Sequence, residues 1–146
     1  MMDATALPTA LAEIREEFLA LGVKNRLQLL LEFSNELPEL PERYRDHPDL
    51  FERVEECQSP VFIFVEVVDD RVHVHATAPA EAPTTRGFAS ILVQGLDGLT
   101  VREVLDLPAD YPQSLGLGEA VSPLRVRGMT GMLGRVRRQV AARAAA

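Results

Sequence analysis

Residues 60–77 read PVFIFVEVVDDRVHVHAT and encode a β-hairpin. At its start the run 60–68 alternates aliphatic and aromatic side chains, so the first strand is apolar on both faces. Asp69-Asp70 forms the turn, and residues 71–77 return with alternating apolar positions. A strand with two apolar faces must be covered twice, so we expect helices or other layers on each face of a small antiparallel sheet.

The segments before the hairpin have helical periodicity. Apolar residues recur at three- and four-residue spacing over residues 11–21, which predicts a helix that ends near Gly22. A second helix is predicted over about 25–37, with Asn25 as its N-cap and Pro38 ending it. Two helices therefore precede the sheet.

The segments after the hairpin are also helical in pattern. A helix is predicted over about 85–96, and Thr100 with Glu103 forms a capping box that opens a short one. Ser122-Pro123 provides an N-cap and a first helical position for a last helix that runs to about residue 142.

The predicted fold class is α+β, a small antiparallel β-sheet flanked by helices. A chain of 146 residues is the size of one domain, and such a domain buries roughly 70% of its unfolded surface. We expect the core to span about residues 11–140, with loose ends at 1–8 and 143–146. Gly128 and Gly131 interrupt the last helix, which predicts close packing against another element there.

Cys57 is the only cysteine of the chain, and a polar loop delivers it to the first strand. Residues 38–59 hold three prolines and many charges, and they predict a loop with a helical turn around 50–54 or a third strand around 51–55. Glu55-Glu56 precedes the cysteine and Gln58-Ser59 follows it. Such polar surroundings favour a reactive thiol over a packed structural one, although the structural alternative stays open.

Composition and charge exclude several classes of function. A hydrophobic content of 47% with 25% charged residues is ordinary for a globular protein, and no apolar stretch could span a bilayer. Residues 1–119 carry all 22 acids and nine of the 15 bases, so the six remaining arginines form a basic tail. An acidic chain without aromatic residues in that tail argues against nucleic-acid binding. A start without a basic flank and apolar core, together with a lone cysteine, indicates a reducing cytoplasm.

Five separated segments resemble the SufE family of sulfur-acceptor proteins in iron–sulfur cluster assembly. Their order and spacing cover roughly residues 11–140. They are Leu37-Pro38-Glu39-Leu40, Cys57-Gln58-Ser59, Val93-Gln94-Gly95-Leu96, Pro108-Ala109-Asp110-Tyr111 with Leu115-Gly116-Leu117, and Ser122-Pro123-Leu124-Arg125-Val126-Arg127-Gly128-Met129.

The resemblance implies a function, partners and a fold. Cys57 would take persulfide sulfur from a cysteine desulfurase of the SufS type, stimulate that enzyme, and deliver the sulfur to an iron–sulfur scaffold of the SufBCD type. Arg125, Gln58, Ser59 and Glu56 would contact the partner, and the fold would be similar to that of IscU-type scaffolds. The protein would be an activator and carrier rather than a stand-alone enzyme, with no cofactor or metal of its own; a homodimer stays open.

Two departures from the family pattern concern the loop that carries the cysteine. The family usually has glycine before the cysteine, where this chain has Glu56. The family's Asp-Ser-Asp run before the middle helix is replaced here by Thr85-Arg86-Gly87-Phe88-Ala89. Nearby glutamates also disfavour the thiolate, so we expect activation by the partner or by an arginine such as Arg125.

Two other classes of function remain as alternatives. A cysteine–histidine hydrolase would pair Cys57 with His47, His73 or His75, but it also needs an oxyanion hole and an orienting partner. The His73-x-His75 pair on one strand face could begin a metal site, although no further ligands have an obvious spacing. A binding module that regulates a desulfurase, with Cys57 incidental, is the third class.

Overall fold

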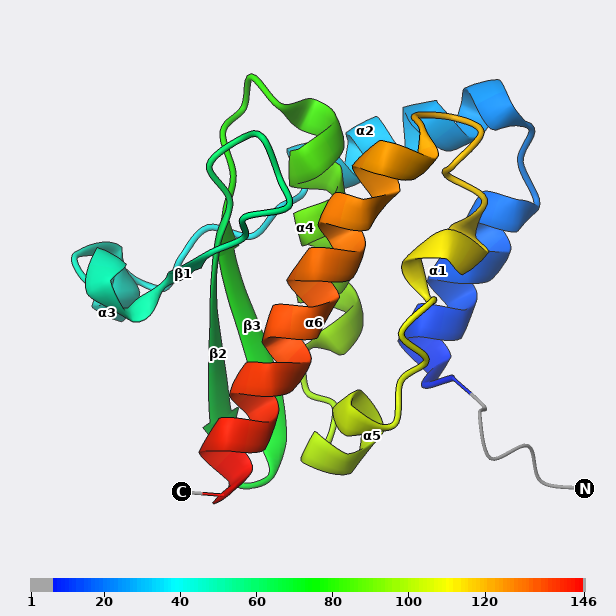
Figure 1. The fold of residues 1–146 in the computed structure, drawn as a ribbon. Helices are drawn as coiled ribbons and strands as arrows, with labels where there is room; N and C mark the ends of the chain where they lie inside the picture. The colour runs from blue at the N-terminus through cyan, green and yellow to red at the C-terminus, as the bar shows by residue number, and fades with distance from the viewer. Residues whose placement is uncertain (1–6, 146) are drawn as a thin grey trace, which may run out of the picture.

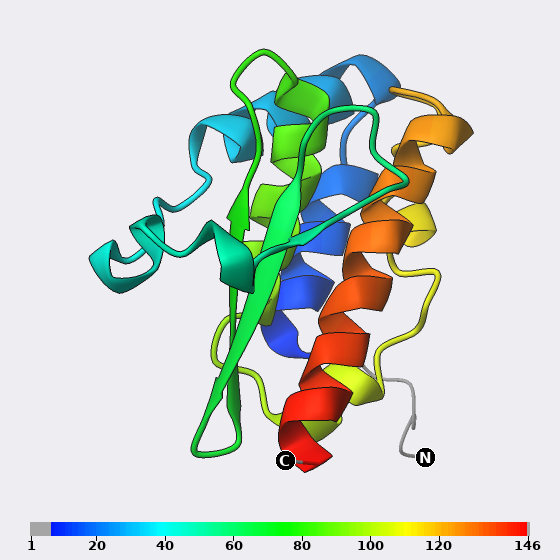
Figure 2. The same cartoon turned by 60° about the vertical axis from the view of Figure 1, so that its left-hand side comes forward.

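The computed structural model describes residues 7–145, and these form a three-stranded sheet with helices packed mainly on one face (Figures 1 and 2). The elements in chain order are α1 (Thr9–Leu19), α2 (Val23–Asn35), α3 (Glu42–Arg45), a 3-10 turn (Pro48–Leu50), β1 (Glu52–Arg53), β2 (Phe62–Val68), β3 (Arg71–Thr77), α4 (Pro83–Leu96), α5 (Val101–Leu105), a second 3-10 turn (Pro112–Leu115) and α6 (Pro123–Ala145).

The sheet is antiparallel, with β2 between β1 and β3. Val65 of β2 lies opposite Val74 of β3, and Ile63 lies opposite Glu52 of β1. Asp69 and Asp70 both have positive φ angles, of 50° and 65°. Aspartate tolerates this left-handed conformation, and two such residues make the tight turn that suits the twist of a hairpin. The predicted hairpin and the α+β class are therefore confirmed.

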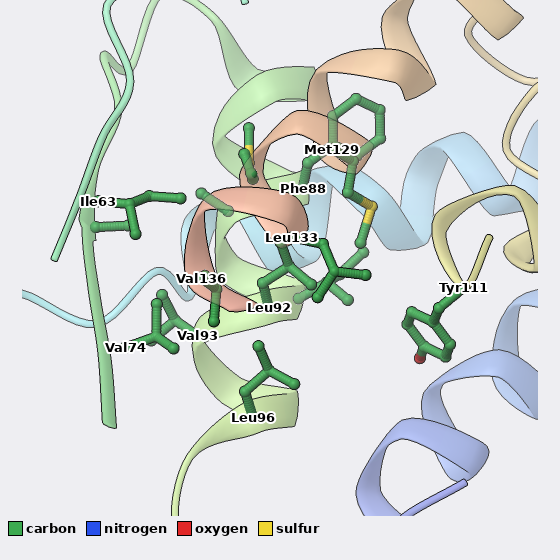
Figure 3. Packing of buried hydrophobic residues seen from close by; sticks show 14 of the residues in the cluster. Ile63, Val74, Phe88, Leu92, Val93, Leu96, Tyr111, Met129, Leu133 and Val136 are labelled. Atoms are coloured by element: carbon green, nitrogen blue, oxygen red, sulfur yellow. The ribbon is translucent and has the colours of Figure 1, made fainter. Parts of the chain in front are cut away.

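The main core lies between the sheet and the pair α4 and α6 (Figure 3). Ile63 and Val74 point inward from the strands, toward the side on which Val93 of α4 and Val136 of α6 lie; all four side chains are buried. The helices α1 and α2 pack on the far side of α4, so α4 is buried on nearly every side. This central position explains its predominantly apolar sequence.

The other face of the sheet is covered by a short segment instead of a helical layer. The Tyr44 ring of α3 packs edge-on against Phe64 with centroids 5.1 Å apart, and the Phe51 ring lies 5.6 Å from the same ring. The Arg143 guanidinium lies 4.9 Å from the Phe64 centroid. The second apolar face of the strand thus has its expected cover, which Figure 1 shows as α3 on the side away from α6.

Three expectations about element boundaries need correction. Asn25 lies inside α2, whose N-cap is Gly22. The helical turn expected around 50–54 is wrong, because the chain there forms the strand β1 at Glu52–Arg53. Residues 143–145 are no loose end, since they continue α6 and Arg143 donates a hydrogen bond to the Val65 carbonyl. The other expected loose ends fall on residues 1–6 and 146, outside the described part, and on Leu7-Pro8, where Leu7 packs against the core.

Candidate functional site

The loop of residues 54–61, between β1 and β2, presents Cys57. The Val54 N–H donates to the Val61 carbonyl at 2.9 Å, which closes the base of the loop. The Cys57 N–H donates to the Val54 carbonyl at 3.2 Å, so the cysteine lies in a tight turn. Val54 and Val61 are fully buried and anchor the loop, which reaches across toward the upper part of α6 in Figure 2.

A cavity of about 550 Å³ lies beside Cys57. Three segments line it: residues 56–59 of the cysteine loop, residues 81–85 at the start of α4, and residues from Ser122 to Gly128 at the start of α6. Glu56, Cys57, Gln58, Ser59 and Arg125 are all among the lining residues. The structure therefore brings together the five site residues that the sequence predicted.

The Cys57 thiol is almost enclosed, with only 7% of the residue exposed. Burial raises its pKa, and the Glu56 carboxylate adds to this effect while Arg135 opposes it, so that the pKa of Cys57 is about 11. The direction agrees with the expectation from the neighbouring glutamates. At neutral pH the enclosed thiol is protonated and therefore a weak nucleophile.

Gly128 and Gly131 of α6 form the surface on which the cysteine loop rests, and we call this surface its seat. A Cβ atom at Gly128 would lie 3.0 Å from the Cys57 Sγ, and one at Gly131 would lie 2.7 Å from the Glu56 carboxyl carbon. Both distances are shorter than ordinary van der Waals contact, so an alanine at either position would press on the loop. The close packing predicted for these glycines is confirmed, and the element packed there is the cysteine loop.

Arg135 holds Glu56 on this seat. Its Nη1 lies 2.8 Å and 3.0 Å from the two carboxylate oxygens, and its Nε donates to the Arg53 carbonyl at 3.2 Å. The hydrogen bond from Arg135 to its carboxylate holds the pKa of Glu56 below its usual range, so this carboxyl group is charged at neutral pH. Sequence reasoning missed Arg135, because its partner Glu56 is 79 residues away in the chain.

Arg125 lies in the first turn of α6 and is exposed. Its main-chain N–H donates to the Ser122 hydroxyl at 3.2 Å, which confirms Ser122 as the N-cap. Within residues 7–145 its guanidinium has no acidic group within 4.0 Å. The charge at the edge of the cavity can therefore meet another molecule.

The segment Thr85-Arg86-Gly87-Phe88-Ala89 in α4 contains one residue that joins elements of the fold and one that lines the cavity. Arg86 donates to the Ser34 and Ala78 carbonyls at 3.0 Å and 2.7 Å, which ties α4 to α2 and to the end of β3. Thr85 lines the cavity, together with Thr84. The part of the cavity wall that these two threonines form is therefore neutral, whereas Glu81 of the same lining segment is acidic.

The histidines lie elsewhere, because none of them lines the cavity. The His73 Nδ1 lies 2.7 Å from Asp97, the His75 Nε2 lies 3.2 Å from Glu66, and His47 lies 3.9 Å from Asp49. No group of three or more histidine, cysteine, aspartate or glutamate side chains that could hold a metal occurs in residues 7–145. Geometry gives no support to the cysteine–histidine hydrolase.

Comparisons with known proteins identify the family of the chain. The sequence matches the family described as "SufE: Fe-S metabolism associated domain" over residues 12–140. An uncharacterized SufE-like protein of Mycobacterium tuberculosis is 48% identical over 141 residues, which are 96% of this chain and 97% of that protein. SufE-like protein 1 of Arabidopsis thaliana, a chloroplastic and mitochondrial protein, is 30% identical over 87% of this chain but only 33% of its own length.

A solved structure has the same fold. The solution structure of a hypothetical protein from Thermus thermophilus superimposes with a TM-score of 0.83 at 34% identity, covering 97% of this chain and all of that one. The α+β fold with its cysteine loop thus defines a SufE-like domain. The chain belongs to the SufE family, whose domain is associated with iron–sulfur metabolism. Within residues 7–145, no helix has the length and apolar character needed to cross a membrane.

Proposed function

We propose that the protein is a sulfur carrier in iron–sulfur cluster assembly, which accepts sulfur on Cys57 from a cysteine desulfurase and passes it to a cluster scaffold. The observation that carries this proposal is that the chain's one thiol lies on the wall of a cavity that Arg125 also lines. Membership of the SufE family supports the same chemistry.

Loading is a thiol exchange that needs no external oxidant. The Cys57 thiolate attacks the outer sulfur of a persulfide on the desulfurase, a new sulfur–sulfur bond forms, and the donor cysteine leaves as a thiolate that takes up the proton lost from Cys57. Unloading repeats the exchange with a thiolate of the scaffold as the attacking group. Cys57 is the only thiol of the chain. No second cysteine of the same chain can therefore attack the Cys57 persulfide, form a disulfide with Cys57 and release the carried sulfur too early.

The enclosed thiol requires activation. With a pKa of about 11, only about one Cys57 in ten thousand is ionised at pH 7. Docking of the desulfurase would raise this fraction by drawing the loop out of its seat and by surrounding the thiol with the donor site, while Arg125 contacts the desulfurase. In the resting protein the thiol is enclosed and protonated, and both properties protect it from oxidation. A reducing compartment such as the cytoplasm would add to this protection.

The test is direct capture of the loaded protein. Incubation with a SufS-type desulfurase and free cysteine should add one sulfur atom to the protein, and a reductant should remove it; intact-mass spectrometry reads both steps. The matched control is Cys57→Ser, which should gain nothing. If Cys57→Ser still stimulates sulfide release fully under reducing conditions, the protein is a regulatory binding module and the carrier proposal is wrong.

A further inference from the structure

Glu56 is held on α6 by two independent contacts. Its carboxylate rests on the bare helix surface at Gly131, where a side chain would collide with it, and Arg135 binds both of its oxygens. Cys57 is the next residue, and its sulfur rests on Gly128 one helical turn earlier. Two consecutive loop residues therefore lie on two consecutive turns of one helix, and a movement of the loop away from α6 takes both of them with it.

The charges around this pair make its release inexpensive. The Glu56 side chain is already 44% exposed, so water can receive its carboxylate when the loop moves. Arg135 keeps a second acid, because its Nε lies 3.7 Å from the Glu52 carboxylate. It also keeps main-chain acceptors on Arg53 and Gly131. Neither partner is left as a buried unpaired charge, which is the arrangement that makes ion pairs costly to break.

We propose that Glu56 and Arg135 are positioning residues that form a releasable latch, which keeps the Cys57 thiol in its seat on α6 until the loop opens for sulfur transfer. The proposal rests on the carrier function for its purpose, but the latch itself belongs to the isolated protein. Glu56, the residue immediately before Cys57, provides the side chain that fastens the loop. Gly131 provides the space that this side chain needs.

The latch predicts how Cys57 reacts with a small alkylating reagent. Reaction requires a thiolate, and the thiolate forms in the open loop, so the rate below the pKa follows the open fraction. Glu56→Gln and Arg135→Gln each remove the ion pair and should raise the alkylation rate at pH 7.5 by about two- to fivefold, the range expected of a partly exposed pair. Glu56→Gln should also move the midpoint of the pH–rate profile downward, toward that of an ordinary thiol, whereas in Arg135→Gln the loss of a cation that lowers the pKa of Cys57 opposes this shift.

The matched control is Arg138→Gln, which removes the same charge from the same helix but breaks the Arg138–Glu52 pair instead. Its alkylation rate should stay at the wild-type value. The double variant Glu56→Gln/Arg135→Gln should be no faster than the single ones, since each alone already opens the latch. High salt should accelerate the wild type and leave both single variants unchanged.

Hydrogen–deuterium exchange gives a readout that does not depend on the thiol. Amides of residues 55–59 should exchange faster in both latch variants, whereas amides of β2 should not change, which also verifies that the variants are folded. Equal rates in Arg135→Gln and Arg138→Gln, by alkylation and by exchange, would overturn the latch. That result would leave the carrier function intact, because the function is tested separately, by sulfur capture on Cys57 and by the stimulation measured with Cys57→Ser.

Discussion

The first part of α6, from Pro123 to Arg135 and called its first half below, and the remainder to Ala145, its second half, hold two neighbouring pieces of chain in opposite ways. The second half seals the edge of β2, where β1 is too short to pair: the buried Gln139 accepts from the Val65 N–H at 2.9 Å and donates to the Ile63 carbonyl at 3.3 Å. The first half holds the cysteine loop with two bare glycine positions and one partly exposed ion pair. The buried hydrogen bonds of Gln139 form a permanent junction between α6 and β2. The partly exposed Glu56–Arg135 ion pair beside Gly131 forms a junction between α6 and the cysteine loop that can open.

The pH dependence of Cys57 is the largest effect that this comparison predicts. Because the pKa of the seated thiol is about 11, its alkylation rate should rise nearly tenfold for each pH unit between about 7 and 10, and level off only near 11. Rapid mixing with an alkylating reagent over this pH range measures the profile. The urea-unfolded protein is the control and should level off at about pH 9. A native profile that coincides with the unfolded one would mean that the loop is open at rest.

Removal of Gln139 should break the permanent junction. Gln139→Ala leaves the Val65 N–H buried without an acceptor, and this should cost about 1–3 kcal/mol of the free energy of unfolding. Urea denaturation measures the loss. Arg135→Gln serves as the comparison from the first half and should cost less than about 1 kcal/mol. Equal losses in the two variants would show that the loop is held as firmly as the sheet edge.

Substitution of Arg125 should weaken binding to the desulfurase without changing how the cysteine loop is held. It lies at the cavity edge but has no acidic neighbour in the described chain, so Arg125→Ala should leave stability and alkylation of the free protein unchanged. If it meets the desulfurase, binding should weaken by roughly five- to thirtyfold, as expected for an interface arginine. Titration calorimetry with the desulfurase measures this, and Arg127→Ala on the same helix is the control. Undiminished binding in Arg125→Ala would exclude the proposed contact.

The sequence predicted the permanent parts of the molecule far better than the releasable one. The hairpin, the capping box at Thr100 and the Ser122 N-cap follow from local patterns, and the structure has each of them. Cys57 stood out because it is alone. Arg135 did not, because its role depends on Glu56, which is 79 residues away in the chain. A contact between residues so far apart in the sequence leaves no local pattern. The glycines of α6 indicated that another element packs against the helix, but they did not identify it as the cysteine loop.

Substitution of single glycines of α6 by alanine should give the smallest effects, and the two positions should differ clearly. Gly134→Ala meets nothing within 4 Å and should stabilise the protein by up to about 1 kcal/mol through helix propensity alone, with unchanged alkylation. Gly131→Ala gains the same propensity, but its methyl group would displace the flexible end of Glu56 and loosen the loop, so the thiol should react about two- to fivefold faster. Thermal denaturation and alkylation at pH 7.5, measured on both variants, check the pair. If the two alanines behave alike in both measurements, the Gly131 seat does not restrain the loop, and the contrast between the two halves of α6 depends on Arg135 alone.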